Sequence, residues 1–184
     1  GVVGRGELRA QRRAHAPAEA ARLRRAEVGA GRPEARLRGV EVVGRGGVGI
    51  RDRWAGVPRA YHGIAVPGFP NFFMLYGPNT NQGGNSILLI LEAQAQFVAA
   101  TLGAMRDAGA SEVEVAEQAM DRYARDLVRD LGRTVWTDGC ASYFHNAAGD
   151  VVTQLPHTSG WYRAATEEID RDDFVFGGVT CTTS

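Results

Sequence analysis

A short apolar run followed by a polar loop constrains the fold of this chain more than any other part of its sequence. The run FFMLY over residues 72–76 has the length and composition of a β-strand that is buried on both faces. Gly77-Pro78 ends the run, and the eight residues NTNQGGNS over 79–86 contain no apolar side chain. We therefore predict a buried strand that leads directly into a polar loop.

A long amphipathic helix is predicted directly after this loop. From Leu88 to Met105, apolar residues recur every three or four positions, which is the spacing of one helix face. Asn85 or Ser86 can cap its N-terminus, and Gly109 can stop it. The order of strand, loop and helix is that of an open α/β sheet, in which ligands bind beyond the carboxyl ends of the strands.

Two interpretations of the loop are open on these residues alone. The N-terminus of the helix offers unpaired N–H groups and a partial positive charge to an anion or to a polarised carbonyl group. Gly83 and Gly84 would let a planar ligand approach the backbone closely. The alternative is an ordinary βα loop that is polar without binding a ligand.

Further elements are predicted on both sides of this unit. The β-branched run Val40–Val43 indicates an edge strand that enters a glycine turn. Apolar positions from Met120 to Leu131 predict a second helix, which Gly132 closes. After these we expect a hairpin of Tyr143–His145 with Val151–Leu155, a last short helix over Trp161–Ile169, and a loose C-terminal tail.

The Arg-rich start of the chain differs from the rest. Of the 21 basic residues 14 lie within residues 1–59, against 6 of the 21 acidic residues, so the formal net charge of zero averages two unlike parts. Residues 1–38 are mainly Arg, Ala, Gly and Glu, and every aromatic residue lies at or beyond Trp54. Such a leader has little apolar surface to offset the entropy of folding. We expect it to be disordered or to result from a frameshift, and residues 39–184 to carry the folded domain.

Several functional classes find no support in the sequence. The two cysteines are far apart and form no CxxC pair, so we predict neither a disulfide framework nor a zinc site. His62, His145 and His157 lack metal-ligand spacing, and no GxSxG motif indicates a serine hydrolase. The most apolar run, Ile87–Leu91, is far shorter than the roughly 20 residues of a membrane span. We expect a cytoplasmic protein without a membrane partner.

Longer motifs resemble those of a known family. In chain order they are GVEVVGRGG (39–47), RWAGVPRAYHGIAVPGFPNFFMLYGPNTN (53–81), NSILLILEAQ (85–94), TVWTDGCASYF (134–144) and LPHTSGWYRAAT (155–166). Together they resemble the C-terminal part of flavin-containing monooxygenases of the Baeyer–Villiger type, particularly the branch that acts on aryl ketones such as 4-hydroxyacetophenone. The resemblance runs from about Gly39 to Phe174, and GFPNFFMLYGPNTN is its most specific part.

The resemblance implies an α/β fold and a cofactor. It implies the C-terminal fragment of a Rossmann-like FAD-binding domain, with buried strand, polar loop and helix, followed by a helix and a β-hairpin. The loop and the start of the helix would lie against the isoalloxazine ring of FAD, where a helix N-terminus stabilises negative charge. The implied cofactor-binding residues are Gly77, Pro78, Asn79, Thr80, Asn81, Asn85, Ser86 and Ile87. No catalytic residue is assigned.

The chain departs from the family pattern at two places. Gly83-Gly84-Asn85 stands where the family commonly has Gly-His-Asn, which removes a side chain beside the flavin, and Ser142-Tyr143-Phe144 stands in place of Ser-Trp-Tyr. We predict that the dinucleotide-binding units for FAD and NADPH, and the active-site arginine of the family, lie outside this chain. The NADPH site is then not encoded here, and we expect the isolated chain to be inactive.

Two functions from different classes follow. In the first, the whole enzyme uses NADPH, FAD and O₂ to insert one oxygen atom beside the carbonyl of a small-molecule ketone. In the second, the chain is a non-catalytic interaction module whose Arg-rich arm binds nucleic acid or a protein partner. We favour the first and do not expect a nucleic-acid partner, because the arm has no aromatic residue for base stacking.

Overall fold

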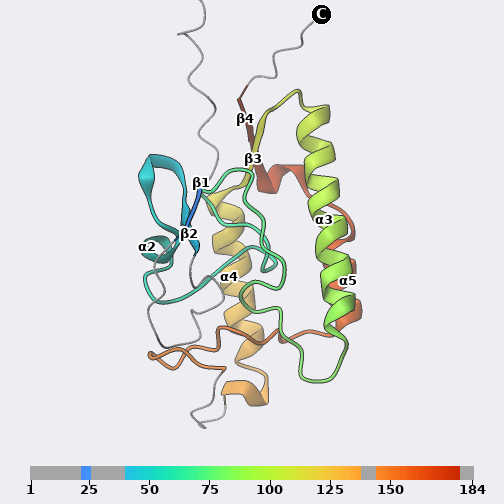
Figure 1. Cartoon of the computed structure of the whole chain (residues 1–184). Coiled ribbons are helices and arrows are strands. Elements are labelled where there is room, and N and C mark those ends of the chain that lie inside the picture. Colours follow the sequence, from blue (N-terminus) through green and yellow to red (C-terminus); the bar gives the residue numbers. More distant parts are fainter. Residues whose placement is uncertain (1–21, 26–39, 138–143, 179–184) are drawn as a thin grey trace, which may run out of the picture.

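The computed structural model describes residues 22–25, 40–137 and 144–178 (Figure 1). Its helices are α2 (Ile50–Trp54), α3 (Ile87–Asp107), α4 (Glu117–Leu131) and α5 (Ser159–Glu167). Its strands are β1 (Arg22–Arg25), β2 (Val40–Val43), β3 (Glu112–Val115) and β4 (Phe174–Gly177), with the 3-10 helices η3 (Arg45–Gly47), η4 (Val135–Thr137) and η5 (Arg171–Asp173). The described part is a mixed α/β structure.

Helix α3 follows the polar loop, as the apolar spacing predicted. The hydroxyl of Ser86 accepts a hydrogen bond from the N–H of Leu88, so Ser86 is the N-cap. At the other end, Gly109 has a φ of 63°, the left-handed conformation that commonly ends a helix. Both ends of α3 are therefore as predicted.

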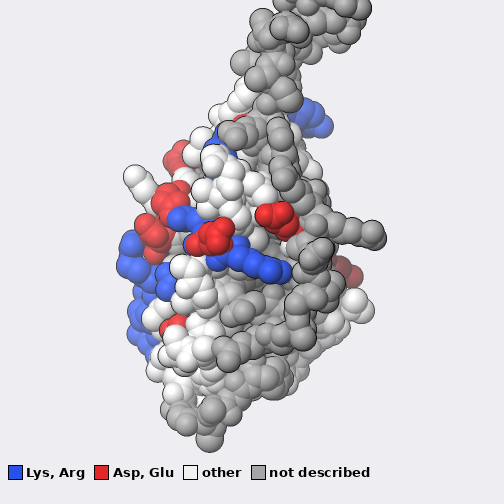
Figure 2. All heavy atoms as spheres, turned by 60° about the vertical axis from the view of Figure 1, so that its left-hand side comes forward, with Lys and Arg blue, Asp and Glu red and all other residues white. Residues whose placement is uncertain are grey.

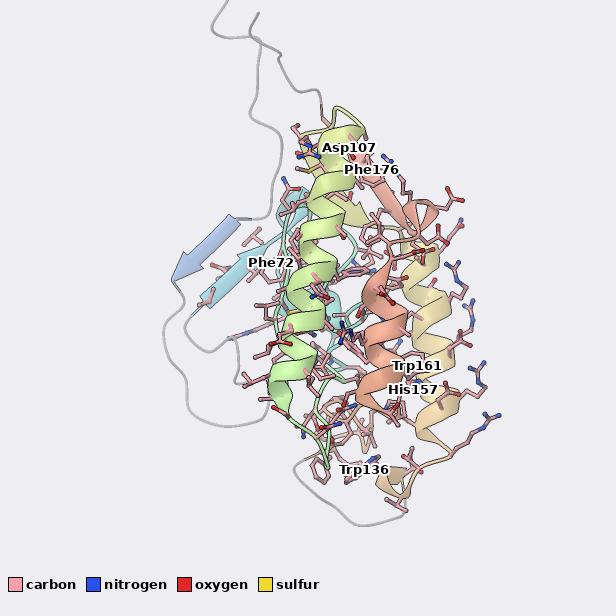
Figure 3. All side chains as sticks on the ribbon, turned by 90° about the vertical axis from the view of Figure 1, so that its right-hand side faces the viewer. Phe72, Asp107, Trp136, His157, Trp161 and Phe176 are labelled. Atoms are coloured by element: carbon pink, nitrogen blue, oxygen red, sulfur yellow. The ribbon has the colours of Figure 1, made fainter. Side chains whose placement is uncertain are left out.

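Helices α4 and α5 follow α3 in the described part of the chain. Gly132 is the C-cap of α4, as predicted. Helix α5 begins earlier than predicted, at Ser159, because the side chain of Thr158 accepts from the N–H of Trp161 and caps the helix there. Helices α3 and α5 pack side by side (Figures 1 and 3). Their contact is centred on Tyr162, which is fully buried.

Two small antiparallel sheets are present. Strand β2 confirms the strand predicted at Val40–Val43, and it pairs with β1. Strand β3 pairs with β4, with Val115 opposite Phe174. The described residues form no extended parallel sheet; their one parallel contact is an isolated bridge between Asn81 and Gln154. The Rossmann-like part of the prediction is therefore not confirmed.

The prediction of a β-strand at residues 72–76 is wrong. Phe73 forms one isolated bridge with Ala65, and the N–H of Met74 donates to the carbonyl of Ile64 at 2.8 Å. Met74 is buried, but Leu75 is 55% exposed. A strand buried on both faces needs neighbours along both edges and layers on both faces. Only the segment around Ile64 pairs with this one among the described residues.

The predicted hairpin is reduced to a tight turn. Tyr143 lies outside the described residues, and His145 forms one antiparallel bridge with Val151. Beyond this point the chain pairs with the polar loop instead: the N–H of Asn81 donates to Thr153, and the N–H of Leu155 donates to Asn81. The predicted loose tail begins within β4 at Gly177, and its residues 179–184 lie outside the described part.

The core is built around an irregular segment rather than around a sheet. Residues 60–70 are buried apart from Gly68, which is half-buried. Local turns satisfy their backbone groups, as where the N–H of Ile64 donates to the carbonyl of Tyr61 at 2.8 Å. One buried cluster joins this segment to α3, β3, α4 and β4; its members are Tyr61, Ile64, Ala65, Phe97, Val113, Val115, Ala119, Met120 and Phe174.

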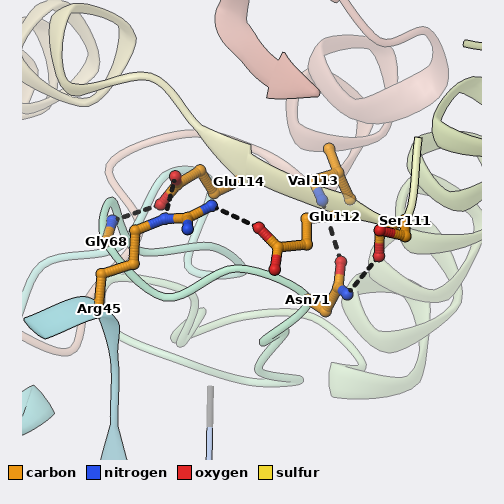
Figure 4. A network of polar contacts seen from close by, with 7 residues as sticks. All are labelled: Arg45, Gly68, Asn71, Ser111, Glu112, Val113 and Glu114. Atoms are coloured by element: carbon orange, nitrogen blue, oxygen red, sulfur yellow. Dashed lines mark hydrogen bonds and ion pairs between the residues drawn. The ribbon is translucent and has the colours of Figure 1, made fainter. Parts of the chain in front are cut away.

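A polar network fastens η3 to strand β3 (Figure 4). The guanidinium of Arg45 donates to Glu112 at 2.7 Å and to Glu114 at 2.8 Å. Glu114 also accepts from the N–H of Gly68. Beside these contacts, the side chain of Asn71 donates to the carbonyl of Ser111 and accepts from the N–H of Val113. Both carboxylates are largely buried, and hydrogen bonds with them raise the pKa of Arg45.

Helix α3 is more apolar than the sequence interpretation allowed. Among the described helices it is the one whose length and composition would suffice to cross a membrane, with a mean hydropathy of 1.6 in its most apolar window, 33% of which is buried. The run Ile87–Leu91 does end at Glu92, but alanine and other apolar residues continue beyond it. By itself this is weak support for a span, because core helices of globular proteins can have the same composition.

Candidate functional site

The predicted cofactor-binding residues are contiguous in space as well as in sequence. They form the loop that enters α3, at the end of the helix where Trp136 also lies (Figure 3). In the structure these residues differ in how far they are exposed to solvent. Asn79 and Thr80 are buried, whereas Asn85 and Ser86 are exposed and Ile87 is half-buried.

The first half of the loop is anchored inside the fold. The side-chain amide of Asn79 donates to the carbonyls of Val151 and Gln154, at 2.9 and 3.1 Å. The hydroxyl of Thr80 donates to the carbonyl of Gly77 at 2.7 Å. Asn79 also has a φ of 55°, a conformation that asparagine tolerates better than most residues. These two side chains therefore shape the loop and do not reach solvent.

The middle of the loop is held by backbone pairing and by one tyrosine. Asn81 exchanges backbone hydrogen bonds with Thr153 and Leu155, and its side-chain oxygen accepts from the hydroxyl of Tyr76 at 2.6 Å. Residues 81 and 153–155 thus act as a short parallel ladder. This ladder fixes where the exposed half of the loop begins.

The second half of the loop is tied to the start of α5 by three hydrogen bonds. Asn85 donates to the hydroxyl of Ser159 at 2.6 Å, and that hydroxyl donates to the side chain of Gln82 at 2.7 Å. Gln82 in turn donates to the carbonyl of His157. The chain of contacts orients an exposed loop by polar bonds to a second helix, as a preorganised binding loop requires.

The N-terminus of α3 offers positive potential at the end of this loop. Its first turn contains no acidic residue. The hydroxyl and carbonyl of Ser86 accept from the N–H groups of Leu88 and Leu89, which leaves the N–H of Ile87 without an acceptor inside the helix. A helix N-terminus in this state favours an anionic or strongly polarised ligand atom.

The glycines before the helix differ in what surrounds them. A Cβ atom built on Gly83 would lie 3.1 Å from the indole ring of Trp136, so the loop backbone rests against that ring. A Cβ atom on Gly84 would meet no atom within 4 Å. The backbone at Gly84 is therefore open to a flat ligand, which fits the chemistry predicted for the loop.

A second polar cluster was missed by the sequence analysis. His62 is 7% exposed, has a φ of 49°, and is surrounded by the rings of Tyr61, Phe97, Tyr123 and Tyr162. Its Nδ1 has no hydrogen-bond partner among the described residues. Burial lowers the pKa of His62 to about 4, although Asp173 opposes the shift. Only a local signal, a histidine between tyrosine and glycine, could have pointed to it.

An open cleft of about 350 Å³ borders this cluster. Asp173 accepts from the hydroxyl of Tyr61 at 2.6 Å and pairs with Arg122. Burial and the Asp173 carboxylate raise the pKa of Tyr61. Farther along the cleft His157 stacks on Trp161, with ring centroids 3.6 Å apart. Acidic and basic side chains both line this cleft, among them Asp130 and Arg129.

One glycine motif needs a structural decision. The prediction that both dinucleotide-binding units lie outside the chain took the GxGxxG motif to be absent from it, and this is wrong, because residues 44–49 have that spacing. The fingerprint requires a parallel strand before it and a long helix after it. Here β2 pairs antiparallel with β1, and α2 spans only Ile50–Trp54. The motif is therefore a turn and not a dinucleotide-binding loop.

The remaining predictions concern metals and nucleic acid. The described residues contain no group of three metal-ligating side chains, and Cys140 and Cys181 lie outside them. On the face shown in Figure 2, basic and acidic side chains of the described residues lie next to one another instead of gathering in a basic patch. One such pair on the described surface is Arg53 with Glu117. The described residues on this face therefore offer no extended surface for phosphate groups.

Comparison with known proteins identifies relatives. No family model matches the chain. A Baeyer–Villiger monooxygenase of Pseudomonas aeruginosa is 39% identical over 135 residues, which make up 72% of this chain and 25% of that protein. An FAD-binding monooxygenase of Aspergillus niger is 31% identical over 147 residues, which make up 77% of this chain and 24% of that protein.

Solved structures agree with these relatives. An oxidised steroid monooxygenase bound to NADP superposes with a TM-score of 0.65 at 27% identity, over 74% of this chain and 26% of that one. A closed cyclohexanone monooxygenase gives a TM-score of 0.63 at 27% identity, over 74% of this chain and 27% of that one. In sequence and fold, then, the chain resembles part of a flavin-dependent monooxygenase. More narrowly, it is related to the Baeyer–Villiger type and spans about a quarter of the length of the curated relatives it matches.

Proposed function

We propose that residues 39–184 form the C-terminal portion of an FAD- and NADPH-dependent monooxygenase that inserts one oxygen atom of O₂ into a ketone. The overall reaction consumes the ketone, O₂, NADPH and a proton, and it yields an ester, NADP⁺ and water. FAD, when bound, supplies the electron transfer and the oxygen chemistry. The share of this chain is to hold and polarise one edge of that cofactor.

One observation carries the proposal. The acid-free N-terminus of α3 stands at the end of a loop anchored on both sides, in a chain that is 39% identical to a Baeyer–Villiger monooxygenase over 135 residues. An electron-rich ring edge is the ligand that such a helix end stabilises. The open backbone at Gly84 supports the approach of a flat ring.

The two halves of the loop would have different roles in binding the cofactor. Gly77, Pro78, Asn79, Thr80 and Asn81 form the anchored half, which fixes the position of the loop. Asn85, Ser86 and Ile87 form the half that would touch the cofactor, by a side-chain amide, a cap hydroxyl and a backbone N–H. No residue of this chain is proposed as an acid or a base in the reaction.

The isolated chain is expected to bind FAD poorly and to have no NADPH oxidase activity. In this proposal it supplies one edge of the cofactor site, and the part of the chain that the structure describes contains no dinucleotide-binding unit. Titration of the purified chain with FAD, followed by flavin fluorescence, and a measurement of NADPH oxidation test this expectation. Purified chain that retains stoichiometric yellow flavin and oxidises NADPH would contradict it.

A chimera tests the proposed function itself. Residues 39–184 replace the matched quarter of the Pseudomonas aeruginosa relative, and the product is assayed for FAD content and ketone-dependent NADPH oxidation. Gly84→Asp places a negative charge at the end of α3, and Gly84→Asn is the uncharged control of the same size. We expect the aspartate to weaken FAD binding about 2- to 10-fold relative to the asparagine. A folded chimera that binds no FAD, or equal affinities of the two variants, would count against the proposal.

A further inference from the structure

One continuous series of hydrogen bonds runs from the start of α5 to the start of α3. The side-chain amide of Gln82 donates to the carbonyl of His157 at 2.9 Å, and the hydroxyl of Ser159 donates to the oxygen of that amide at 2.7 Å. The amide of Asn85 donates to the same hydroxyl at 2.6 Å, and its oxygen accepts from the N–H of Ser86 at 3.0 Å. We call these contacts the Ser159 series.

The two ends of the Ser159 series fix the direction of every bond in it. The backbone carbonyl of His157 can only accept a hydrogen bond, and the backbone N–H of Ser86 can only donate one. Gln82 therefore turns its NH₂ group toward His157 and its oxygen toward Ser159. The single hydroxyl hydrogen of Ser159 is then used, so Asn85 has to present its NH₂ group to that hydroxyl. The surrounding groups thus determine the orientation of the Asn85 amide.

Ser159 is held in place by helix packing. It is the first residue of α5 and is 8% exposed, and α5 packs against α3 around the buried Tyr162. In Figure 3, Asp107 marks the C-terminal end of α3, whereas His157 lies beside the start of α5 toward the opposite end of α3. Both helices therefore begin near the loop. A hydroxyl on a packed helix is a rigid support for a residue of an exposed loop.

The amide of Asn85 has one more donor than the Ser159 series uses. A side-chain amide carries two N–H groups, and the bond to Ser159 takes one of them. Asn85 is exposed, so the other N–H is accessible to a ligand at the N-terminus of α3. An amide rotated by half a turn would offer its oxygen there instead, and that oxygen repels an electron-rich atom. Which edge the amide presents therefore decides whether it attracts or repels such a ligand.

We propose that Ser159 is a positioning residue for this loop: by accepting from the amide of Asn85, it keeps an N–H donor, and not the amide oxygen, available to a ligand beside the N-terminus of α3. The ligand chemistry that fits is an electron-rich ring edge with acceptor atoms. The inference rests on the proposed function only for naming this ligand as the ring of FAD. In this role Ser159 acts through Asn85 and does not itself contact the cofactor.

The orientation of the amide can be measured on the full chain without a cofactor. Ser159→Ala removes the acceptor of the Asn85 amide. Thr166→Val is the matched control, because it also removes a buried hydroxyl from α5, one that bonds only within the helix. The readout is the exchange of the two side-chain amide protons of Asn85 with water, followed by NMR. We expect Ser159→Ala to speed this exchange about 2- to 10-fold, the effect of one hydrogen bond, and the control to leave it unchanged.

The effect on the cofactor is measured in the chimera described above. Reduced FAD is more electron-rich than oxidised FAD, so a donor near the ring favours the reduced form. Ser159→Ala should lower the preference of the chimera for reduced over oxidised FAD about 3- to 10-fold, which lowers the midpoint potential by about 15 to 30 mV. A serine that only stabilised the fold would change the melting temperature and leave the potential where it is.

A double-variant comparison shows whether Ser159 acts through Asn85. Asn85→Ala should lower the midpoint potential at least as much as Ser159→Ala does, because it removes the donor itself. Adding Ser159→Ala to Asn85→Ala should then lower the potential no further, since the group that Ser159 orients is gone. Equal effects of Ser159→Ala with and without the Asn85 amide would overturn the proposal.

Other outcomes are equally decisive. Exchange of the Asn85 amide protons that is the same in Ser159→Ala and the parent chain, or equally fast in Thr166→Val, would reject the positioning role. A chimera that binds no FAD rejects the proposed function, and the exchange measurement on the full chain then decides the positioning role by itself. If circular dichroism shows that Ser159→Ala does not fold, Gln82→Met takes its place, because it removes the acceptor that fixes the direction of the Ser159 hydroxyl. Unchanged exchange in that variant would also reject the proposal.

Discussion

The hydroxyl of Tyr162 on α5 donates to the backbone carbonyl of His62, 100 positions earlier in the chain. The same hydroxyl accepts from the side chain of Gln94 on α3 at 3.0 Å. Both Tyr162 and Gln94 are fully buried. One hydroxyl therefore joins two helices to the turn at His62, whose φ of 49° would otherwise be unfavourable.

Removal of this hydroxyl should destabilise the fold. Tyr162→Phe leaves the amide of Gln94 and the carbonyl of His62 buried with fewer partners, at an expected cost of about 1–3 kcal/mol in the free energy of unfolding. Urea denaturation followed by circular dichroism measures the change. Tyr123→Phe is the matched control, because the hydroxyl of Tyr123 is buried with no partner among the described residues. We expect that control to be neutral or stabilising, and a loss equal to that of Tyr162→Phe would contradict the argument.

Stability should fall as the pH drops below about 6.5, partly because of His62. Its pKa is about 4 in the folded chain and about 6.5 when exposed, so the unfolded chain binds more protons between these values. The folded chain keeps His62 neutral, and this contribution to the free energy of unfolding is complete above pH 6.5. It is lost progressively as the pH falls toward 4, and it amounts to at most on the order of 3 kcal/mol.

His62→Phe isolates this contribution, because phenylalanine cannot titrate. The pH dependence of the unfolding free energy should be shallower in the variant between pH 4 and 6.5. Burial also lowers the pKa of His157, against the opposing charge of Asp130, so part of the slope will persist. Identical slopes in the variant and the parent chain would show that His62 does not titrate as its environment implies.

Gly63 and Gly77 allow the anchored half of the loop to cross closely over the buried turn at His62. A Cβ atom on Gly77 would lie 2.2 Å from the carbonyl oxygen of Gly63, which cannot move without the turn. Gly77→Ala should therefore lower the free energy of unfolding by about 3 kcal/mol or more. Gly84→Ala, where a Cβ atom meets nothing within 4 Å, should stay within about 0.5 kcal/mol of the parent. Thermal melts of both variants measure this difference. Equal melting temperatures of Gly77→Ala and Gly84→Ala would contradict the packing argument.

The elements that could be predicted from the sequence depend on local patterns. Helices α3 and α4 follow from apolar spacing and from their ends at Ser86, Gly109 and Gly132. The strand predicted at 72–76 failed because burial on both faces depends on neighbours, and one neighbour only is among the described residues. The amino-acid composition of a segment determines whether it can adopt an extended conformation. Whether it becomes a β-strand depends on the segments that pair with it.

The candidate site follows the same division. Its residues could be found because they are consecutive and because a polar loop before a helix is a local pattern. The contacts of Asn79 with Val151 and of Asn85 with Ser159 span more than 70 positions, and no periodic pattern in the sequence predicts contacts of this kind. The buried turn at His62 was missed for the same reason, since the aromatic rings around His62 come from α3, α4 and α5.

The last prediction concerns the charge network of Figure 4. Arg45→Met leaves Glu112 and Glu114 side by side, with side chains that are 6% and 12% exposed and no cation between them. Because Arg45 itself is 40% exposed, water replaces part of its charge, and we expect a loss of roughly 1–3 kcal/mol rather than the larger cost of a fully buried pair.

A surface arginine provides the control for this change. Arg106 pairs with Asp107 where both side chains are mostly exposed, so Arg106→Met should change the free energy of unfolding by less than about 0.5 kcal/mol. Adding Glu112→Gln to Arg45→Met removes one of the two unpaired charges and should recover part of the loss, because a neutral amide is cheaper to bury than a carboxylate. Denaturation midpoints of the three variants measure these differences. A double variant that is less stable than Arg45→Met alone would mean that the buried carboxylate finds another partner once the guanidinium is gone.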